Sequence, residues 1–252
     1  MPPKLAPWPR ARYQPGGGKA LVFYVIYGEF SEEPKISAST YRTAGVPQGV
    51  DLRKVTRKQQ PELPFTEDSF KVVRKGNAAL FEQIKTAPEC LILQGEVPDS
   101  QDLNYLRDVV GLVMFALDHG GLAVMDVQQL ELFDAPRWRK EIFEPQPPHL
   151  QKQVAILYSD EVDGARWYHT RGLRKFGRPD LSTRCPKREL DDAVIEMFNR
   201  FILLQAQGSL IPEGQEIRMV SLPAGLTCHQ AGSLDDPDFN NVHIEVRWLD
   251  GK

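Results

Sequence analysis

The sequence predicts an α+β fold made of two α/β-sandwich units, each with a mixed or antiparallel sheet and helices packed on one face. Short β-branched and aromatic runs are interspersed with helical patterns, and several of these runs come in hairpin-like pairs. A proline-rich segment, EPQPPH, separates two halves that share a loose order of strand, helix and strand. With 252 residues, the chain is long enough for two domains of roughly 100–130 residues each.

The chain begins with an irregular arm, residues 1–19, which contains five prolines and three glycines. Its PGGGK segment is similar in composition to a phosphate-binding loop. In such a loop, however, the glycines follow a strand and open a helix, whereas these glycines precede a strand. We therefore interpret them as a flexible hinge.

The first α+β unit is expected over residues 20–143. The segments predicted in it are a buried strand at 20–30, a surface loop at 51–64, a helix from Asn77 to Pro88, a strand at 90–97, a helix at 103–117 capped by Asp99 or Ser100, either a hairpin or a bent strand at 122–134, and a helix that starts at Asp134. Asn and Asp are favoured N-caps because their side chains accept hydrogen bonds from free backbone N–H groups. A glycine in HGG is expected to end the long helix in the left-handed conformation.

The proline-rich linker covers residues 144–150, and the second α+β unit covers 151–252. Strands are predicted at 153–159, 215–221, 226–230 and 241–249, and a helix with apolar residues at i, i+3, i+4 and i+7 is predicted over 190–202, ending at Gly208. In the last strand, apolar residues alternate with polar ones, which is typical of a sheet with one face in water.

The composition excludes several classes of function. A net charge of −3 makes nucleic-acid binding improbable, because such proteins carry a basic footprint. The three cysteines show no CxxC spacing, so neither a disulfide framework nor a zinc ribbon is expected. Catalytic and nucleotide-binding signatures such as GxSxG, HExxH and GxGxxG are absent, and no cofactor or metal is predicted. We expect a soluble cytoplasmic protein that does not enter a membrane.

The stretch WYHTRGLRKFGRPDL, residues 167–181, differs from ordinary core and ordinary surface. Between Arg166 and Arg188 there are eight cationic residues and one acid, Asp180. Arginine suits carboxylates and phosphates because its planar fork binds them through two hydrogen bonds. A second interpretation stays open, in which the arginines form a solvated loop and pair with nearby acids. Gly172 and Gly177 predict a compact turn in either case.

The same stretch resembles a His-Thr-x-Gly-Leu…Gly-x-Pro-Glu/Asp-Leu signature of uncharacterised bacterial α+β domain families, over some fifteen to twenty residues. The resemblance implies a fold and the place of a loop, but no reaction. The main functional hypothesis is a non-catalytic binding or interaction module, with an anion-contacting loop at 166–180 that takes an anionic small molecule or an acidic protein segment. The predicted binding residues are His169, Thr170, Arg171, Arg174, Arg178, His243 and Glu245. The alternative is a hydrolase that acts on a phosphate or other anionic ester through His169, His243 and Glu245, so whether the protein is an enzyme stays undecided.

Overall fold

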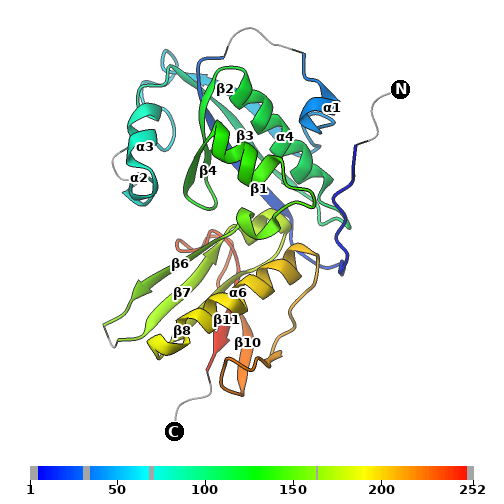
Figure 1. The fold of residues 1–252 in the computed structure, drawn as a ribbon, viewed down its shortest axis with the longest axis vertical. Helices are drawn as coiled ribbons and strands as arrows, with labels where there is room; N and C mark the ends of the chain where they lie inside the picture. Colours follow the sequence, from blue (N-terminus) through cyan, green and yellow to red (C-terminus); the bar gives the residue numbers. More distant parts are fainter. Residues whose placement is uncertain (1–4, 31–34, 68–70, 163, 249–252) are drawn as a thin grey trace. The chain divides into compact units, whose positions relative to one another are not determined.

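A computed structural model describes residues 5–30, 35–67, 71–162 and 164–248 (Figure 1). The chain divides into two compact units. The first contains the residues up to Pro9, Leu21–Val97 and Asp102–His149, and the second contains Arg10–Ala20, Pro98–Gln101 and the chain from Leu150 onward. Each unit has one sheet and its own helices, so the α+β class is confirmed. Two segments that precede the proline-rich linker, residues 10–20 and 98–101, belong to the second unit.

The sheet of the first unit has the strand order β2-β3-β1-β4-β5. Its strands are β1 (Ala20–Gly28), β2 (Val50–Thr56), β3 (Glu89–Val97), β4 (Gly121–Asp126) and β5 (Glu131–Asp134). Its helices are α1 (Ala38–Tyr41), α2 (Lys71–Gly76), α3 (Ala78–Ile84), α4 (Asn104–Asp118) and α5 (Ala135–Trp138), and a π-helical turn (Arg139–Phe143) continues α5. The pairs β2–β3, β1–β4 and β4–β5 are antiparallel, and the last pair is the predicted hairpin.

This first sheet is covered on both faces, whereas the expected packing was on one face. Val25 and Tyr27 of β1 belong to a core cluster with side chains of α2 and α3. Tyr24 of the same strand instead contacts Trp138 of α5, with ring centroids 5.7 Å apart. Because successive residues of a strand point to opposite faces, these helices lie on opposite sides. The physical reason is that β1 is buried at nearly every position, so neither of its faces can remain in water.

Two further expectations for the first unit were wrong. The predicted surface loop at 51–64 contains β2, an edge strand with exposed residues that pairs with β3 and shows no apolar alternation. Helix α4 is not capped by Asp99 or Ser100, because its N-cap is Leu103, which makes no side-chain cap. The caps at Asn77 and Asp134 are confirmed, since their side chains accept hydrogen bonds from backbone N–H groups three residues later. Gly120 ends α4 with a φ of 104°.

The sheet of the second unit has the order β6-β7-β8-β11-β10-β9. Its strands are β6 (Ala155–Asp160), β7 (Arg166–Arg171), β8 (Asp180–Cys185), β9 (Glu216–Ile217), β10 (Leu226–Ala231) and β11 (His243–Arg247). Three 3-10 turns, η2 (Leu150–Gln153), η3 (Leu173–Phe176) and η4 (Arg188–Leu190), accompany the long helix α6 (Asp191–Ala206). The sheet is mixed, because β8 and β11 are parallel and the other pairs are antiparallel.

Helix α6 covers one face of this sheet (Figure 1). The ring of Phe198 on α6 packs edge-on against Tyr168 of β7, and both side chains are buried. The opposite face, which we call the open face, carries the side chains that alternate with those on the α6 side. They are Trp167, His169, Ser182, Arg184, Thr227, His229, His243, Glu245 and Arg247. In the described residues, no helix combines the length and apolar character needed to cross a membrane.

Candidate binding site

The arginine-rich stretch folds into a short turn between β7 and β8, as predicted. Gly172 and Gly177 bracket the 3-10 turn η3 with φ values of 117° and 63°, which favour glycine. Between them, Leu173 and Phe176 are both fully buried. The turn is therefore anchored in the core at both of its apolar positions.

Asp180 holds this turn together from inside. Its Oδ1 accepts hydrogen bonds from the Thr170 hydroxyl at 2.8 Å and the Leu173 N–H at 3.2 Å, and its Oδ2 accepts from the Asn241 side-chain amide at 2.8 Å. Burial raises the pKa of Asp180 to about 6, although these hydrogen bonds oppose the rise. Thr170, one of the predicted binding residues, is fully buried and also accepts from the Leu181 N–H. Thr170 therefore positions the turn and faces no ligand.

Two cations of the stretch are interior groups. Lys175 is buried and donates to the Gln153 carbonyl at 2.7 Å. Arg178, another predicted binding residue, is buried too, and its guanidinium donates to Asp99 and to the carbonyls of Gly177, Gln14, Gly208 and Ser209. Part of the local excess of positive charge seen in the sequence is therefore buried inside the second unit and is not available at the surface.

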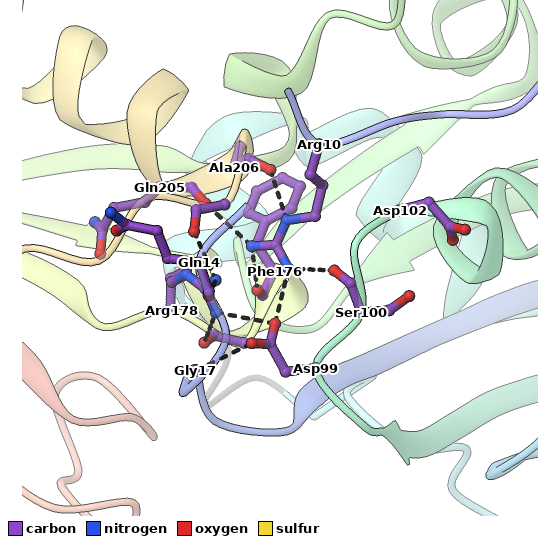
Figure 2. A network of polar contacts seen from close by, with 12 residues as sticks. Arg10, Gln14, Gly17, Asp99, Ser100, Asp102, Phe176, Arg178, Gln205 and Ala206 are labelled. Atoms are coloured by element: carbon purple, nitrogen blue, oxygen red, sulfur yellow. Dashed lines mark hydrogen bonds and ion pairs between the residues drawn. The ribbon is translucent and has the colours of Figure 1, made fainter. Parts of the chain in front are cut away.

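Figure 2 shows that Arg178 belongs to a buried clamp, which we define as Arg10, Asp99 and Arg178. The Asp99 carboxylate lies between the two guanidinium groups, with N–O distances of 2.9 Å to Arg10 and 3.0 Å to Arg178. Arg10 also donates to the carbonyls of Gln205 and Ala206 at the end of α6. A helix C-terminus carries partial negative charge and free carbonyls, which explains why two cations can share one acid here.

The same clamp fixes the glycine-rich segment of the arm, which we had interpreted as a hinge. The Gly17 N–H donates to Asp99 Oδ2 at 3.0 Å, and the Gly18 N–H donates to the Gly177 carbonyl at 3.1 Å. A Cβ atom on residue 17 would lie 1.6 Å from Nη1 of Arg178. Close packing, and not hinge motion, is therefore the structural reason for glycine at position 17.

Two other predicted residues, Arg171 and Arg174, fasten the loop that precedes β11. Nη1 of Arg171 donates to the Asp238 carbonyl at 2.7 Å, and Nη1 of Arg174 donates to the Asn240 carbonyl at 2.8 Å. Between these two anchors lies Phe239, whose ring is buried. The two arginines thus place a phenyl ring against the open face.

Phe239 completes a row of four rings on the open face. Centroid distances are 4.3 Å from Trp167 to His169, 5.6 Å from His169 to Phe239 and 4.1 Å from Phe239 to His243. We call these four residues the aromatic row. His169 and His243 were predicted from the sequence as binding residues, and Trp167 lies in the same arginine-rich stretch. No sequence pattern indicated that Phe239 would join them.

Both imidazoles of the aromatic row have a buried Nδ1 atom without a hydrogen-bond partner, although Nδ1 of His243 lies 4.0 Å from Oδ2 of Asp236. Burial, followed by the nearby charge of Arg171, lowers the pKa of His169 to about 4. Burial also lowers the pKa of His243, although Asp236 opposes the change. Both rings are therefore neutral near pH 7, and an unpaired buried nitrogen is the kind of group that a bound ligand can satisfy.

Glu245 lies on the open face but does not join the two histidines in a catalytic chain. Its carboxylate accepts from Nε of Arg247 at 2.7 Å and lies 3.9 Å from Nη1 of Arg184. The Phe239 ring contacts His169 on one side and His243 on the other. The hydrogen bonds recorded for the described residues include none that links Glu245 to either imidazole.

Within the described part of the chain, no three His, Cys, Asp or Glu side chains are grouped so that they could hold a metal ion.

A comparison with models of protein families, with curated proteins and with solved structures found no match.

Proposed function

We propose that this protein is a binding module that takes a carboxylate- or phosphate-bearing ligand on the open face of its second sheet. The observation that carries the proposal is the aromatic row, in which the neutral imidazole of His169 has a buried Nδ1 without a hydrogen-bond partner and that of His243 has only Asp236, at 4.0 Å. The ligand could be a small molecule or an acidic protein segment, since both present the same anionic group. The proposed contacts are Trp167, His169 and His243, together with Arg184 of β8.

In this proposal Arg184 contacts the anion, whereas the sequence analysis had predicted that contact for Arg178. Its side chain is 57% exposed, and its guanidinium lies 6.0 Å from the centre of the Trp167 ring. Its present partners are Glu161, at 3.1 Å, and Glu245, at 3.9 Å. Exposed ion pairs of this kind contribute about 0–1 kcal/mol, so an incoming anion can replace Glu161 at little cost.

The neutral imidazoles give the proposed site a property that can be measured. An anion bound beside His169 would favour the imidazolium form and raise its pKa from about 4 toward the ordinary value. Binding below pH 6 should therefore be accompanied by proton uptake. A solvated surface patch of paired charges would show no such coupling.

The test is a thermal-shift screen of the wild-type protein against carboxylates, phosphorylated metabolites, nucleotides and an acidic peptide. A true ligand should raise the melting temperature of the wild type, and the rise should be lost in Arg184→Ala and in His169→Phe. Arg200→Ala is the matched control, because Arg200 is an exposed arginine of α6 that pairs only with Glu196 among the recorded ion pairs. A ligand that shifts all three variants equally would place the site elsewhere, and a screen without any hit would overturn the proposal.

We further propose a cytoplasmic location in a bacterium, and the cysteines support the cytoplasmic part of that proposal. Cys90, Cys185 and Cys228 are all free and buried. Free thiols are typical of reducing compartments, where disulfides do not persist.

A further inference from the structure

Strand β10 carries a second polar arrangement, separate from the aromatic row. Nδ1 of His229 lies 2.7 Å from Oε1 of Glu213, and Nε2 of the same ring lies 2.9 Å from Oγ1 of Thr227. The three side chains thus form a continuous chain of carboxylate, imidazole and hydroxyl. Thr227 and His229 share the open face because they are two residues apart on one strand.

Glu213 is held in place by its own backbone surroundings. The Gly214 N–H donates to the Cys228 carbonyl at 2.8 Å, and the Cys228 N–H donates to the Gln215 carbonyl at 3.0 Å. The second carboxylate oxygen of Glu213 accepts from the Gln230 N–H at 2.7 Å. Two backbone hydrogen bonds therefore fasten the segment after Glu213 to β10, and a third fastens the carboxylate itself, although the Glu213 side chain is 61% exposed.

These contacts decide how the protons are arranged. The hydrogen bond from the Gln230 N–H, followed by that from His229, lowers the pKa of Glu213, so its carboxylate is ionised and can only accept. Nδ1 of His229 must then carry a proton. In the neutral ring Nε2 is an acceptor, so the Thr227 hydroxyl donates to it. This is the arrangement in which an imidazole acts as general base toward a hydroxyl nucleophile.

A cation stands beside the hydroxyl. Arg247 of β11 is directly opposite Thr227 in the antiparallel register, and Glu245 is opposite His229. Directly opposite residues have Cβ atoms about 4.5–5.5 Å apart. The Arg247 side chain is 55% exposed, so its guanidinium can contact a negative group on a molecule that approaches Thr227.

We propose that Thr227 is a nucleophilic hydroxyl, activated by His229 and Glu213, which accepts the acyl group of a carboxylic ester that carries a negative charge. In the first step the Thr227 Oγ–acyl bond forms and the ester C–O bond breaks. The hydroxyl proton passes to Nε2 of His229 and from there to the leaving alkoxide. A water molecule then gives a proton to Nε2 of His229 and attacks the acyl carbon. The Thr227 Oγ–acyl bond breaks, Oγ takes the proton back from His229, and the carboxylic acid is released.

This activity uses other residues than the proposed ligand site, and either proposal can fail without the other. The ligand screen depends on Arg184 and His169, whereas acyl transfer depends on Thr227, His229 and Glu213.

The test uses the full chain with two probes, 4-nitrophenyl acetate and the anionic 4-nitrophenyl succinate. We expect release of 4-nitrophenol and, by peptide mass spectrometry, an acyl adduct on Thr227. Removal of the base or the nucleophile should lower the rate by about 100-fold or more. The succinate should react faster than the acetate, and Arg247→Gln should remove that difference.

The informative variants are Thr227→Val, which keeps the side-chain shape, and Glu213→Gln, whose exposed position makes it safe for folding. Thr40→Val is the matched control, because Thr40 is an exposed threonine of the first unit. Equal rates in the wild type, Thr227→Val and Glu213→Gln would overturn the proposal. Adducts found only on lysines of the wild-type protein would overturn it as well.

Discussion

Replacing Asp99 by alanine should destabilise the second unit strongly. Asp99 accepts hydrogen bonds from Arg10, Arg178 and Gly17 at 2.9, 3.0 and 3.0 Å. The two arginine side chains are 1% and 0% exposed, and that of Asp99 is 10% exposed. Without the carboxylate, two buried guanidinium groups would lose the one acidic side chain that they share. Removal of one member of a buried ion pair costs about 3–5 kcal/mol, and we expect a loss of that size in the free energy of unfolding.

Urea unfolding, followed by tryptophan fluorescence, measures this loss, because Trp167 and Trp248 both belong to the second unit. Glu196→Ala is the control. The side chains of Glu196 and of its ion-pair partner Arg200 are 47% and 63% exposed, so this pair should contribute only about 0.2–1 kcal/mol to the free energy of unfolding. If Asp99→Ala lost less than about 1 kcal/mol, the clamp would not stabilise the fold and the reasoning from burial would be refuted.

Three further predictions concern packing, pH and thiol reactivity. Gly17→Ala should lower the free energy of unfolding by about 1–3 kcal/mol, measured by thermal unfolding, because the new Cβ meets Arg178. Gly76→Ala, with open space around the new Cβ, should leave the stability unchanged or raise it. Equal effects of the two substitutions would contradict the packing argument. His169 has a lowered pKa of about 4, so the neutral ring stabilises the fold above pH 6.5 and this contribution disappears as the pH falls through about 4. Between neutral pH and pH 4, the His169→Phe variant should therefore lose about 1–2 kcal/mol less free energy of unfolding than the wild type, a figure reduced for the partial exposure of the ring. Identical profiles of stability against pH would count against a neutral His169. Burial raises the pKa of all three cysteine thiols, so they should react with Ellman's reagent only when the chain unfolds, and rapid reaction of the folded protein would disprove this.

Local features of the fold were predictable from sequence. The caps at Asn77 and Asp134, the turn between Gly172 and Gly177 and the alternation of the last strand all depend on residues a few positions apart. Such features arise from backbone geometry and short hydrogen bonds, which a linear pattern records directly.

Features that depend on a distant partner were missed. The strand β2 has no apolar alternation, and it forms because β3 offers it a free edge. Asp99 looked like a helix cap, but two arginines from distant parts of the chain take its carboxylate. A local pattern cannot report such competition, because the stronger partner is far away in sequence.

The sequence by itself determined that this protein has two α+β units, that its second half ends in a sheet with one wet face, and that residues 167–181 form a tight turn rich in cations. Only the tertiary structure decided what those cations do, since it buries Lys175 and Arg178 and leaves Arg184 exposed. It also decided which histidines share the open face, because a shift of strand register by one residue moves every side chain to the other face. Charge and periodicity are properties of the chain, but partners and burial are properties of the packed sheet.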